Sequence, residues 1–289
     1  MRVKHARVRA AAWYVAATLI SVVTVFPLVW TVLTSVRPES EILSAGFRFL
    51  PRALTLDNYR IAFREVPFPR YLLNSLILGT GGTLLNLVLG SLAGYAFARL
   101  AFRFREQLFW LLISAMMVPG VITMIPWFLI LHGVPLVGGN DLLGRGGVGL
   151  INTFWAVILP GAAGPFATFM MRQQFGSVDG AFAEAARLDG AGEFRIFARI
   201  YLPLVKPGLA VLAILTFQAG WNNFLWPLIV LNTADMMPIQ VGLAVFRQQY
   251  ETAYGPLMAG TLIACVPVIL IFVFFQRWII EGATSAAIK

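Results

Sequence analysis

Residues 10–36 read AAAWYVAATLISVVTVFPLVWTVLTSV, a run without one charged side chain. A helix needs about 20 apolar residues to cross the hydrocarbon core of a membrane. This run is longer than that, and much longer than the roughly 7–15 apolar residues of a signal peptide. It therefore predicts a first membrane span that is retained in the protein.

Uncharged runs of similar length recur along the rest of the chain, which predicts an all-α integral membrane protein with six transmembrane helices. The expected spans lie near 13–36, 71–98, 107–131, 151–171, 208–231 and 257–277. Hydrophobic residues make up 59% of the chain and charged residues 12%, against about 25% charged in soluble domains. This composition excludes a soluble enzyme and a disordered chain, and the single cysteine, Cys265, excludes a disulfide scaffold.

The distribution of positive charge predicts how the chain is oriented. The net charge is +9, and with a cytoplasmic N-terminus the inside segments hold 14 of the 22 Lys and Arg residues. Cationic loops are retained on the cytoplasmic side of a membrane. We therefore expect both termini inside, with residues 1–12 as a cytoplasmic N-terminus and about 278–289 as a cytoplasmic tail. The basic charge is assigned to the membrane and not to nucleic acid.

Several spans contain residues that bend or break helices. Pro119-Gly120 interrupts the third span, Gly164-Pro165 the fourth and Pro227 the fifth. Proline removes a backbone donor and its ring clashes with the preceding turn. Glycines in the second span, among them Gly79, Gly82, Gly90 and Gly94, should let neighbouring helices approach closely. The pattern favours bent, tightly packed helices around a pathway.

The chain lacks the residues that would drive transport by itself. The interiors of the proposed spans hold no Asp, Glu, Lys, Arg or His, which argues against coupling to an ion gradient. No GK[ST] phosphate loop, no H-E-x-x-H and no G-x-S-x-G occurs. We expect no catalytic residue, no metal site and no cofactor, so energy for uphill transport would come from a partner.

The hairpin of residues about 178–203, between the fourth and fifth spans, is the most informative segment. A short helix is predicted from an N-cap at Ser177 or Asp179 to Asp189, stopped by Gly190 with a positive φ. A second helix is predicted from Glu193 to about Leu202, ended by Pro203.

Spacing also predicts which hairpin residues share a face. Phe182, Ala185 and Ala186 should lie together on the first helix, where one aromatic ring beside two alanines could sit deep in a groove. Arg195 and Arg199 should form a cationic strip on the second helix. A linker whose apolar residues lie on the bilayer surface is the alternative interpretation.

Glu184-Ala185-Ala186, then Gly190, then Ile200-Tyr201-Leu202-Pro203 match every position of the EAA motif, EAA-x3-G-x9-I-x-L-P. The chain thereby resembles the permease subunits of binding-protein-dependent ABC importers. Further matches resemble the MalG-type carbohydrate branch of that family. They are Asn74-Ser75-Leu76, Ala93-Gly94-Tyr95-Ala96-Phe97-Ala98-Arg99, Trp221-Asn222-Asn223-Phe224-Leu225-Trp226-Pro227-Leu228 and Gln276-Arg277-Trp278.

The resemblance implies a type I ABC importer (MetI-like) permease fold, with 13–289 as a single transmembrane permease domain in a prokaryotic inner membrane. It implies a second permease subunit, two ATP-binding subunits that hold ATP and Mg, and an extracytoplasmic solute-binding protein that delivers a sugar. The hairpin would dock on an ATPase subunit. The implied coupling residues are Phe182, Glu184, Ala185, Ala186, Asp189, Gly190, Arg195, Arg199 and Pro203.

A polar group on the fifth span is the candidate substrate contact. It consists of Gln218, Trp221, Asn222 and Asn223. Aromatic faces stack on sugar rings, and amides both donate to and accept from hydroxyls. Amides in membrane helices equally serve as hydrogen-bonded contacts between helices. The two competing functions are an ion-coupled secondary transporter, which would transport alone, and a membrane scaffold without a path.

Overall fold

The computed structural model describes residues 2–44, 48–247 and 252–287, and the side chains of 11–44, 48–247, 252–274 and 276. Within these ranges the regular elements are helices, apart from an isolated antiparallel bridge between Arg247 and Thr252. The predicted all-α class is therefore confirmed. Most side chains of the expected N-terminus 1–12, and all those of the tail 278–289, lie outside the described residues.

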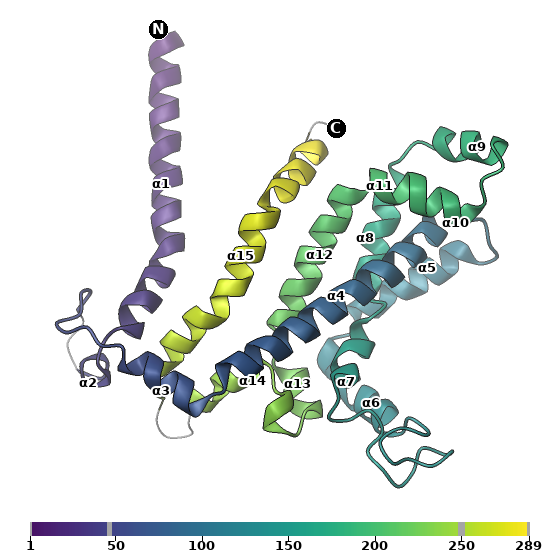
Figure 1. Cartoon of the computed structure of the whole chain (residues 1–289). Helices are drawn as coiled ribbons and strands as arrows, with labels where there is room; N and C mark the ends of the chain where they lie inside the picture. The colour runs from purple at the N-terminus through teal and green to yellow at the C-terminus, as the bar shows by residue number, and fades with distance from the viewer. Residues whose placement is uncertain (1, 45–47, 248–251, 288–289) are drawn as a thin grey trace. The chain divides into compact units, whose positions relative to one another are not determined.

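Figure 1 shows the helices in chain order. The first group is α1 (Arg2–Ser35), α2 (Glu39–Ile42), α3 (Asp57–Glu65), α4 (Phe68–Arg99), α5 (Arg105–Ser114), η1 (Ala115–Met117) and α6 (Gly120–His132). The middle group is α7 (Phe154–Ile158), η2 (Leu159–Gly161), α8 (Pro165–Gly176), α9 (Ala181–Leu188), α10 (Glu193–Ile196), η3 (Phe197–Tyr201) and α11 (Leu202–Leu204). The last group is α12 (Lys206–Trp221), α13 (Leu225–Val230), η4 (Ala234–Met236), α14 (Ile239–Leu243), η5 (Ala244–Phe246) and α15 (Tyr254–Ala287).

Three of the described helices are long and apolar enough to cross a membrane without a break: Ala11–Ser35, Phe68–Arg99 and Tyr254–Phe274. They correspond to the first, second and sixth predicted spans. Three more candidates are pairs of helices bent at a short break, which gives up to six spans if each pair is one span. The pairs are Arg105–Met117 with Gly120–His132 (105°), Phe154–Gly161 with Pro165–Gly176 (46°) and Glu193–Leu204 with Lys206–Trp221 (80°).

The third, fourth and fifth predicted spans are each divided between separate helices, as their helix-breaking residues predicted. Val118 and Gly164 are both extended, with ψ of 118° and 141°. Each precedes a proline, whose ring disfavours helical backbone in the residue before it. In the fifth predicted span, helix α12 ends at Trp221, and Pro227 lies in the separate helix α13. A helix running through Pro227 would clash with the carbonyl of the residue four positions earlier.

The chain divides into two compact units. Unit 1 comprises residues 1–68 and 243–266, and unit 2 comprises 69–242 and 267–289. The expected single domain over 13–289 stays a prediction.

Side chains tie the helix ends of unit 1 together. The carboxylate of Glu39 accepts hydrogen bonds from the backbone N–H groups of Tyr254 (3.1 Å) and Gly255 (2.9 Å), so it caps the start of α15. The buried amide of Asn58 donates to the carbonyls of Ser35 (2.9 Å) and Arg37 (2.7 Å). These hydrogen bonds hold the end of α1 against α3.

Unit 2 is organised around α4, whose glycines contact neighbouring helices. A Cβ atom added to Gly90 or Gly94 would lie 2.7 Å from Ala167 or 2.5 Å from Met171, both on α8. One added to Gly79 would lie 2.9 Å from the ring of Phe217 on α12. The close approach predicted for these three glycines is confirmed, and Gly82 has open space instead. Helices α8 and α12 also contact each other.

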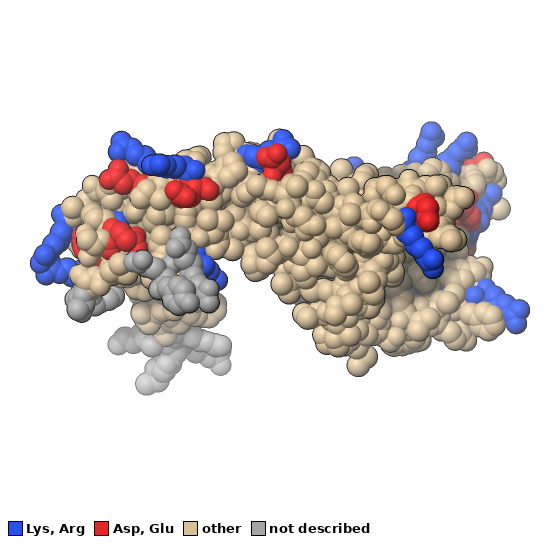
Figure 2. Space-filling model, turned by 90° about the horizontal axis from the view of Figure 1, so that it is seen from below, with Lys and Arg blue, Asp and Glu red and all other residues tan. Residues whose placement is uncertain are grey.

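Charged side chains are sparse on the visible surface in Figure 2, where Lys, Arg, Asp and Glu stand in small separate groups within a largely uncharged surface. Many large apolar side chains of α1, α5 and α6 are exposed, including Trp13 (70%), Trp110 (66%) and Ile125 (72%). Such exposure fits a hydrocarbon environment, because soluble proteins rarely expose contiguous apolar surface of this kind.

Candidate functional site

Hydrogen bonds mark both ends of the first helix of the hairpin, α9. The carboxylate of Asp179 accepts a hydrogen bond from the backbone N–H of Ala181 (3.0 Å), whereas the hydroxyl of Ser177 donates to the carbonyl of Gln174. The N-cap position itself is held by Gly180, so the expected N-cap at Ser177 or Asp179 was wrong, although the Asp179 carboxylate binds the N–H of the first helical residue.

Gly190 ends α9 with φ of +77°, as predicted. Its N–H donates to the carbonyl of Arg187 (3.0 Å), and the N–H of Ala191 donates to the carbonyl of Ala186 (2.9 Å). These two bonds form a Schellman motif, in which a residue in the left-handed conformation reverses the chain. The turn fixes the direction in which the second arm of the hairpin leaves α9.

The faces of α9 differ from the expectation. Phe182 (54%) and Ala185 are exposed, but Ala186 (9%) is buried together with Ala183 (4%). The shared face of Phe182, Ala185 and Ala186 was therefore wrong, because Ala186 points into the hydrophobic core that closes the hairpin. The outward surface of the first arm includes Phe182, Glu184, Ala185, Leu188 and Asp189.

The second arm is helical from Glu193 to Leu204, not to Leu202, and Pro203 does not end it. Residues Phe197–Tyr201 form a π-helix immediately before the proline. A wider turn there moves the carbonyl of Arg199 away from the ring of Pro203 four residues later, which relieves the usual clash. Arg195, Arg199 and Pro203 are exposed, as is Phe194 (75%).

Aromatic rings hold the second arm against α4 and α8. Tyr95 of α4 lies 5.6 Å from Phe175, 5.2 Å from Phe197 and 5.4 Å from Tyr201, measured between ring centroids. All four side chains are less than 9% exposed, and Ile196 is fully buried beside them. Edge-to-face aromatic pairs add to the stabilisation from burial alone, so the hairpin is a packed part of unit 2.

Charged groups surround these aromatic rings. The guanidinium of Arg99, at the end of α4, donates to the carbonyls of Phe175 (Nε, 3.0 Å) and Val178 and lies 5.0 Å from the centroid of the Tyr201 ring. Arg99 thereby satisfies carbonyls that the end of α8 leaves without a helical partner.

The carboxylate of Glu193 joins α4 to both arms of the hairpin. It accepts a hydrogen bond from the hydroxyl of Tyr95 (2.9 Å) and one from Nε of Arg187 (2.8 Å). The hydrogen bond to Glu193 raises the pKa of the Arg187 guanidinium. Tyr95, Arg187 and Glu193 are from here on called the charged latch.

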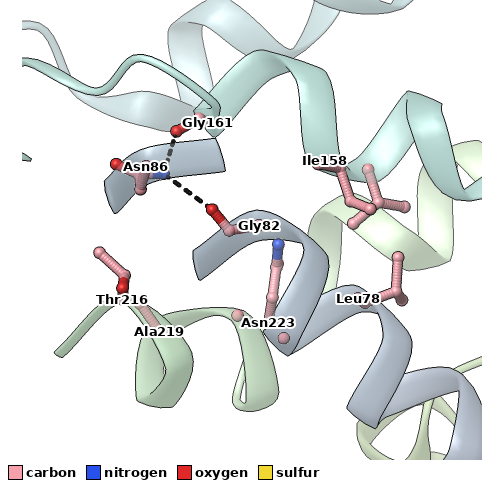
Figure 3. Close-up of a pocket in the computed structure, with 11 residues that line it drawn as sticks. Leu78, Gly82, Asn86, Ile158, Gly161, Thr216, Ala219 and Asn223 are labelled. Atoms are coloured by element: carbon pink, nitrogen blue, oxygen red, sulfur yellow. Dashed lines mark hydrogen bonds between the residues drawn. The ribbon is translucent and has the colours of Figure 1, made fainter. Parts of the chain in front are cut away.

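A pocket of about 240 Å³ lies within unit 2, beside the break between η2 and α8. Figure 3 shows Asn86 on its wall, with hydrogen bonds from the amide to the carbonyls of Gly82 and Gly161. Thr216 and Asn223 also line it. The wall therefore combines apolar side chains with a few hydrogen-bonding groups, as small-molecule sites do. We call it the central pocket.

The structure brings one of the four predicted substrate-path residues, Asn223, to the central pocket. Trp221 is 1% exposed and stacks on Phe217 at 5.7 Å, so its ring packs in the protein interior. Asn222 accepts a hydrogen bond from Gln240 (3.3 Å), and Gln218 is exposed but outside the pocket lining.

Asn86, Arg99 and the charged latch were not predicted as site residues. An amide within a membrane span signals a hydrogen-bonded contact between helices, and Asn86 makes one with the carbonyl of Gly161. The link from Arg99 to the carbonyls near residue 175 has no sequence signal, since it depends on how α4 and α8 end in space.

Comparisons with known proteins agree with this geometry. Residues 86–284 match the family described as "Binding-protein-dependent transport system inner membrane component". The chain is 37% identical to the arabinooligosaccharides transport system permease protein AraQ of Halalkalibacterium halodurans, over 93% of each chain. It is 32% identical to the lactose transport system permease protein LacG of Rhizobium radiobacter, over 93% of each chain.

A solved structure has the same fold. One chain of a bacterial ABC transporter involved in the import of alginate superposes with a TM-score of 0.78 and 21% identity, covering 94% of this chain and 96% of that one. The expected type I importer fold is thus confirmed, and the chain belongs to the family of binding-protein-dependent transport inner-membrane components. It is an inner-membrane permease subunit of an ABC transporter of the carbohydrate type.

Proposed function

We propose that this chain forms half of the translocation path of an ATP-driven importer for a sugar or short oligosaccharide. The observation that carries the proposal is the hairpin, which packs on α4 and α8, turns at Gly190 and has an exposed apolar surface. The sugar is supported by the names of the relatives and by the central pocket, where Asn86, Thr216 and Asn223 offer groups that pair with hydroxyls.

The outer surface of the hairpin suits docking to an ATPase subunit. Phe182 (54%), Leu188 (90%) and Phe194 (75%) are exposed on a segment predicted to face the cytoplasm. Exposed aromatic and aliphatic side chains of this size are typical of protein interfaces. We infer that they enter a groove of the ATPase, with Glu184, Asp189, Arg195 and Arg199 at the rim.

The size of the central pocket supports a second permease chain. Sites for small molecules usually enclose about 300–1,000 Å³, and this chain alone encloses about 240 Å³. A second permease subunit would complete the wall. Two ATPase subunits would bind ATP and Mg, a solute-binding protein would deliver the cargo from outside, and this chain would take no part in catalysis.

The test is to purify the chain with its native partners and reconstitute the complex in vesicles. ATP turnover is then measured with the binding protein loaded with individual sugars. We expect one sugar class to stimulate turnover and to accumulate inside. Accumulation by this chain alone, driven by an ion gradient, would replace the proposal with a secondary transporter. Turnover that no solute stimulates, in a complex without an outward cavity, would favour a scaffold.

Gly190 offers the sharpest test of the hairpin as the coupling element. Open space surrounds its Cα, so substitution creates no clash, but φ of +77° disfavours a side chain. The left-handed conformation costs roughly 1–2 kcal/mol for an ordinary residue and less for Asn. We expect Gly190→Val to reduce solute-stimulated ATP turnover at least about tenfold, and Gly190→Asn to retain most of it. Membrane insertion of both variants should be unchanged. Normal transport by Gly190→Val would contradict the coupling role.

A further inference from the structure

A second cavity lies at the hairpin end of unit 2, separate from the central pocket. It measures about 460 Å³ and is lined by the end of α4, the start of α5 and the last turns of α8. Helices α5 and α8 contact each other along this side (Figure 1). The lining side chains include Arg105, Arg172, Gln173 and Ser177, so the cavity is polar. We call it the basic cavity.

The charges of the basic cavity leave an excess of one positive charge. Glu106 accepts hydrogen bonds from Nη2 of Arg172 (2.9 and 3.0 Å) and from Nε of Arg105 (3.3 Å). The Arg172 guanidinium lies 3.7 Å from the centroid of the Phe109 ring. One carboxylate thus balances two fixed guanidinium groups, which have further N–H donors to offer.

The backbone near the basic cavity does not oppose an anion. The carbonyls at the end of a helix carry partial negative charge, and α8 ends here at Gly176. Arg99 donates to the carbonyls of Phe175 and Gly176, which offsets that charge. A negative group at Arg105 and Arg172 would therefore meet no uncompensated acceptors of α8.

An apolar surface adjoins the basic cavity on α5. Leu108 (46%), Trp110 (66%) and Leu111 (68%) are exposed within two turns of Arg105. Tryptophan is enriched where the hydrocarbon region of a membrane meets its headgroups. Guanidinium groups beside such a surface match a ligand with a negative head and apolar chains.

We propose that the basic cavity binds the headgroup phosphate of an anionic phospholipid, with the acyl chains along the exposed face of α5. Basic pockets between membrane helices on the cytoplasmic side suit such headgroups, and the anionic cytoplasmic leaflet supplies them. The site is independent of the sugar path, because none of its lining residues borders the central pocket.

The experiment uses the complete complex of permeases and ATPases. The complex is equilibrated with phosphatidylcholine vesicles that either contain or lack phosphatidylglycerol. Native mass spectrometry then measures the phosphatidylglycerol that stays bound. Removing one arginine that interacts with an anionic lipid headgroup should weaken lipid binding about fivefold. We expect Arg105→Gln and Arg172→Gln each to weaken phosphatidylglycerol binding by about that factor. Arg145→Gln, an exposed arginine on the loop between α6 and α7, should leave it unchanged.

Glu106→Gln separates binding from folding, because it removes the competing carboxylate and loosens the same ion pairs. We expect it to strengthen phosphatidylglycerol binding about fivefold, whereas a folding defect would weaken it. Equal binding by wild type, Arg172→Gln and Glu106→Gln would overturn the proposal. Displacement of the lipid by inorganic phosphate at similar concentration would assign the cavity to a free anion instead. Loss of ATPase subunits from both arginine variants would assign it to a protein partner.

Discussion

The two ends of α4 are both attached to distant parts of unit 2, but by different chemistry. At the hairpin end, Arg99 donates to carbonyls near residue 175, and Tyr95 donates to Glu193. At the other end, Asn74 donates to the carbonyls of Asp235 (2.8 Å) and Met237 (2.9 Å). The hairpin end uses charged groups that are partly exposed. The buried contact at the other end is made by a neutral amide that is 1% exposed, and the guanidinium of Arg70 adds one exposed contact to the carbonyl of Asp235 (3.0 Å).

The difference follows from the surroundings of each end. A neutral amide can be buried with little cost if its hydrogen bonds are made, whereas burying a charge costs far more. Asn74 therefore fits a dry contact between α4 and the loop before α14. Guanidinium and carboxylate groups suit the hairpin, which water reaches, and a long arginine can bond several carbonyls at once. We infer that the contacts at the hairpin end are strong but weakened by salt, and that the buried contact of Asn74 does not depend on salt.

The largest effect is expected for Arg99→Ala. Hydrogen bonds from charged donors contribute about 1.5–3 kcal/mol each, and Arg99 donates to three carbonyls. Its loss should free the hairpin from α4 and reduce solute-stimulated ATP turnover by more than about a hundredfold. Limited proteolysis of the assembled complex should show new cleavage within 178–206.

Arg99→Lys tests the geometry of this contact. Lysine keeps the charge but lacks the planar fork that reaches several acceptors, so we expect an intermediate loss of turnover. Arg103→Ala, an exposed arginine whose guanidinium lies over the Phe104 ring, is the matched control and should behave as wild type. If Arg99→Ala and Arg103→Ala were equally active, the hairpin would not depend on α4.

An intermediate effect is expected for Asn74→Ala. The change leaves the carbonyl of Met237 without the donor that Asn74 supplies, at about 1–3 kcal/mol for an unsatisfied buried group. The carbonyl of Asp235 keeps the hydrogen bond from Nε of Arg70 (3.0 Å). Thermal unfolding of the purified complex should begin several degrees lower, by the same amount at low and high salt. Asn232→Ala is the control, since the Asn232 side chain is exposed. A salt-dependent shift for Asn74→Ala would contradict the contrast between the two ends.

Features that depend on nearby residues in the sequence were predicted, whereas features that depend on contacts between distant segments were not. The positive φ of Gly190 follows from its place after a short helix, and three long spans follow from uncharged runs alone. Proline was an unreliable signal, because Pro27, Pro126 and Pro267 lie inside helices. The breaks at Pro119 and Pro165 have an adjacent glycine, which lowers the cost of leaving the helix.

The site was less predictable than the fold, for a physical reason. Ala186 was expected on a face that docks in a groove and Trp221 on the substrate path, yet both side chains are buried within the chain. Helical spacing predicts which residues share a face of a helix, but it does not predict which face packs against the hydrophobic core. Asn86 and Glu193 gain their roles from partners 75 and 98 positions away along the chain, Gly161 and Tyr95.

The smallest effect is expected for the charged latch. Arg187 and Glu193 are each nearly half exposed, at 45% and 44%, and exposed ion pairs contribute little because water and salt screen them. Glu193→Gln should lower ATP turnover by less than about threefold, and high salt should make wild type resemble the variant. Tyr95→Phe keeps the ring contacts with Phe175 and Phe197 and removes only the hydroxyl, so it should match Glu193→Gln. A loss with either variant as large as that of Arg99→Ala would show that the latch, and not the arginine, holds the hairpin to α4.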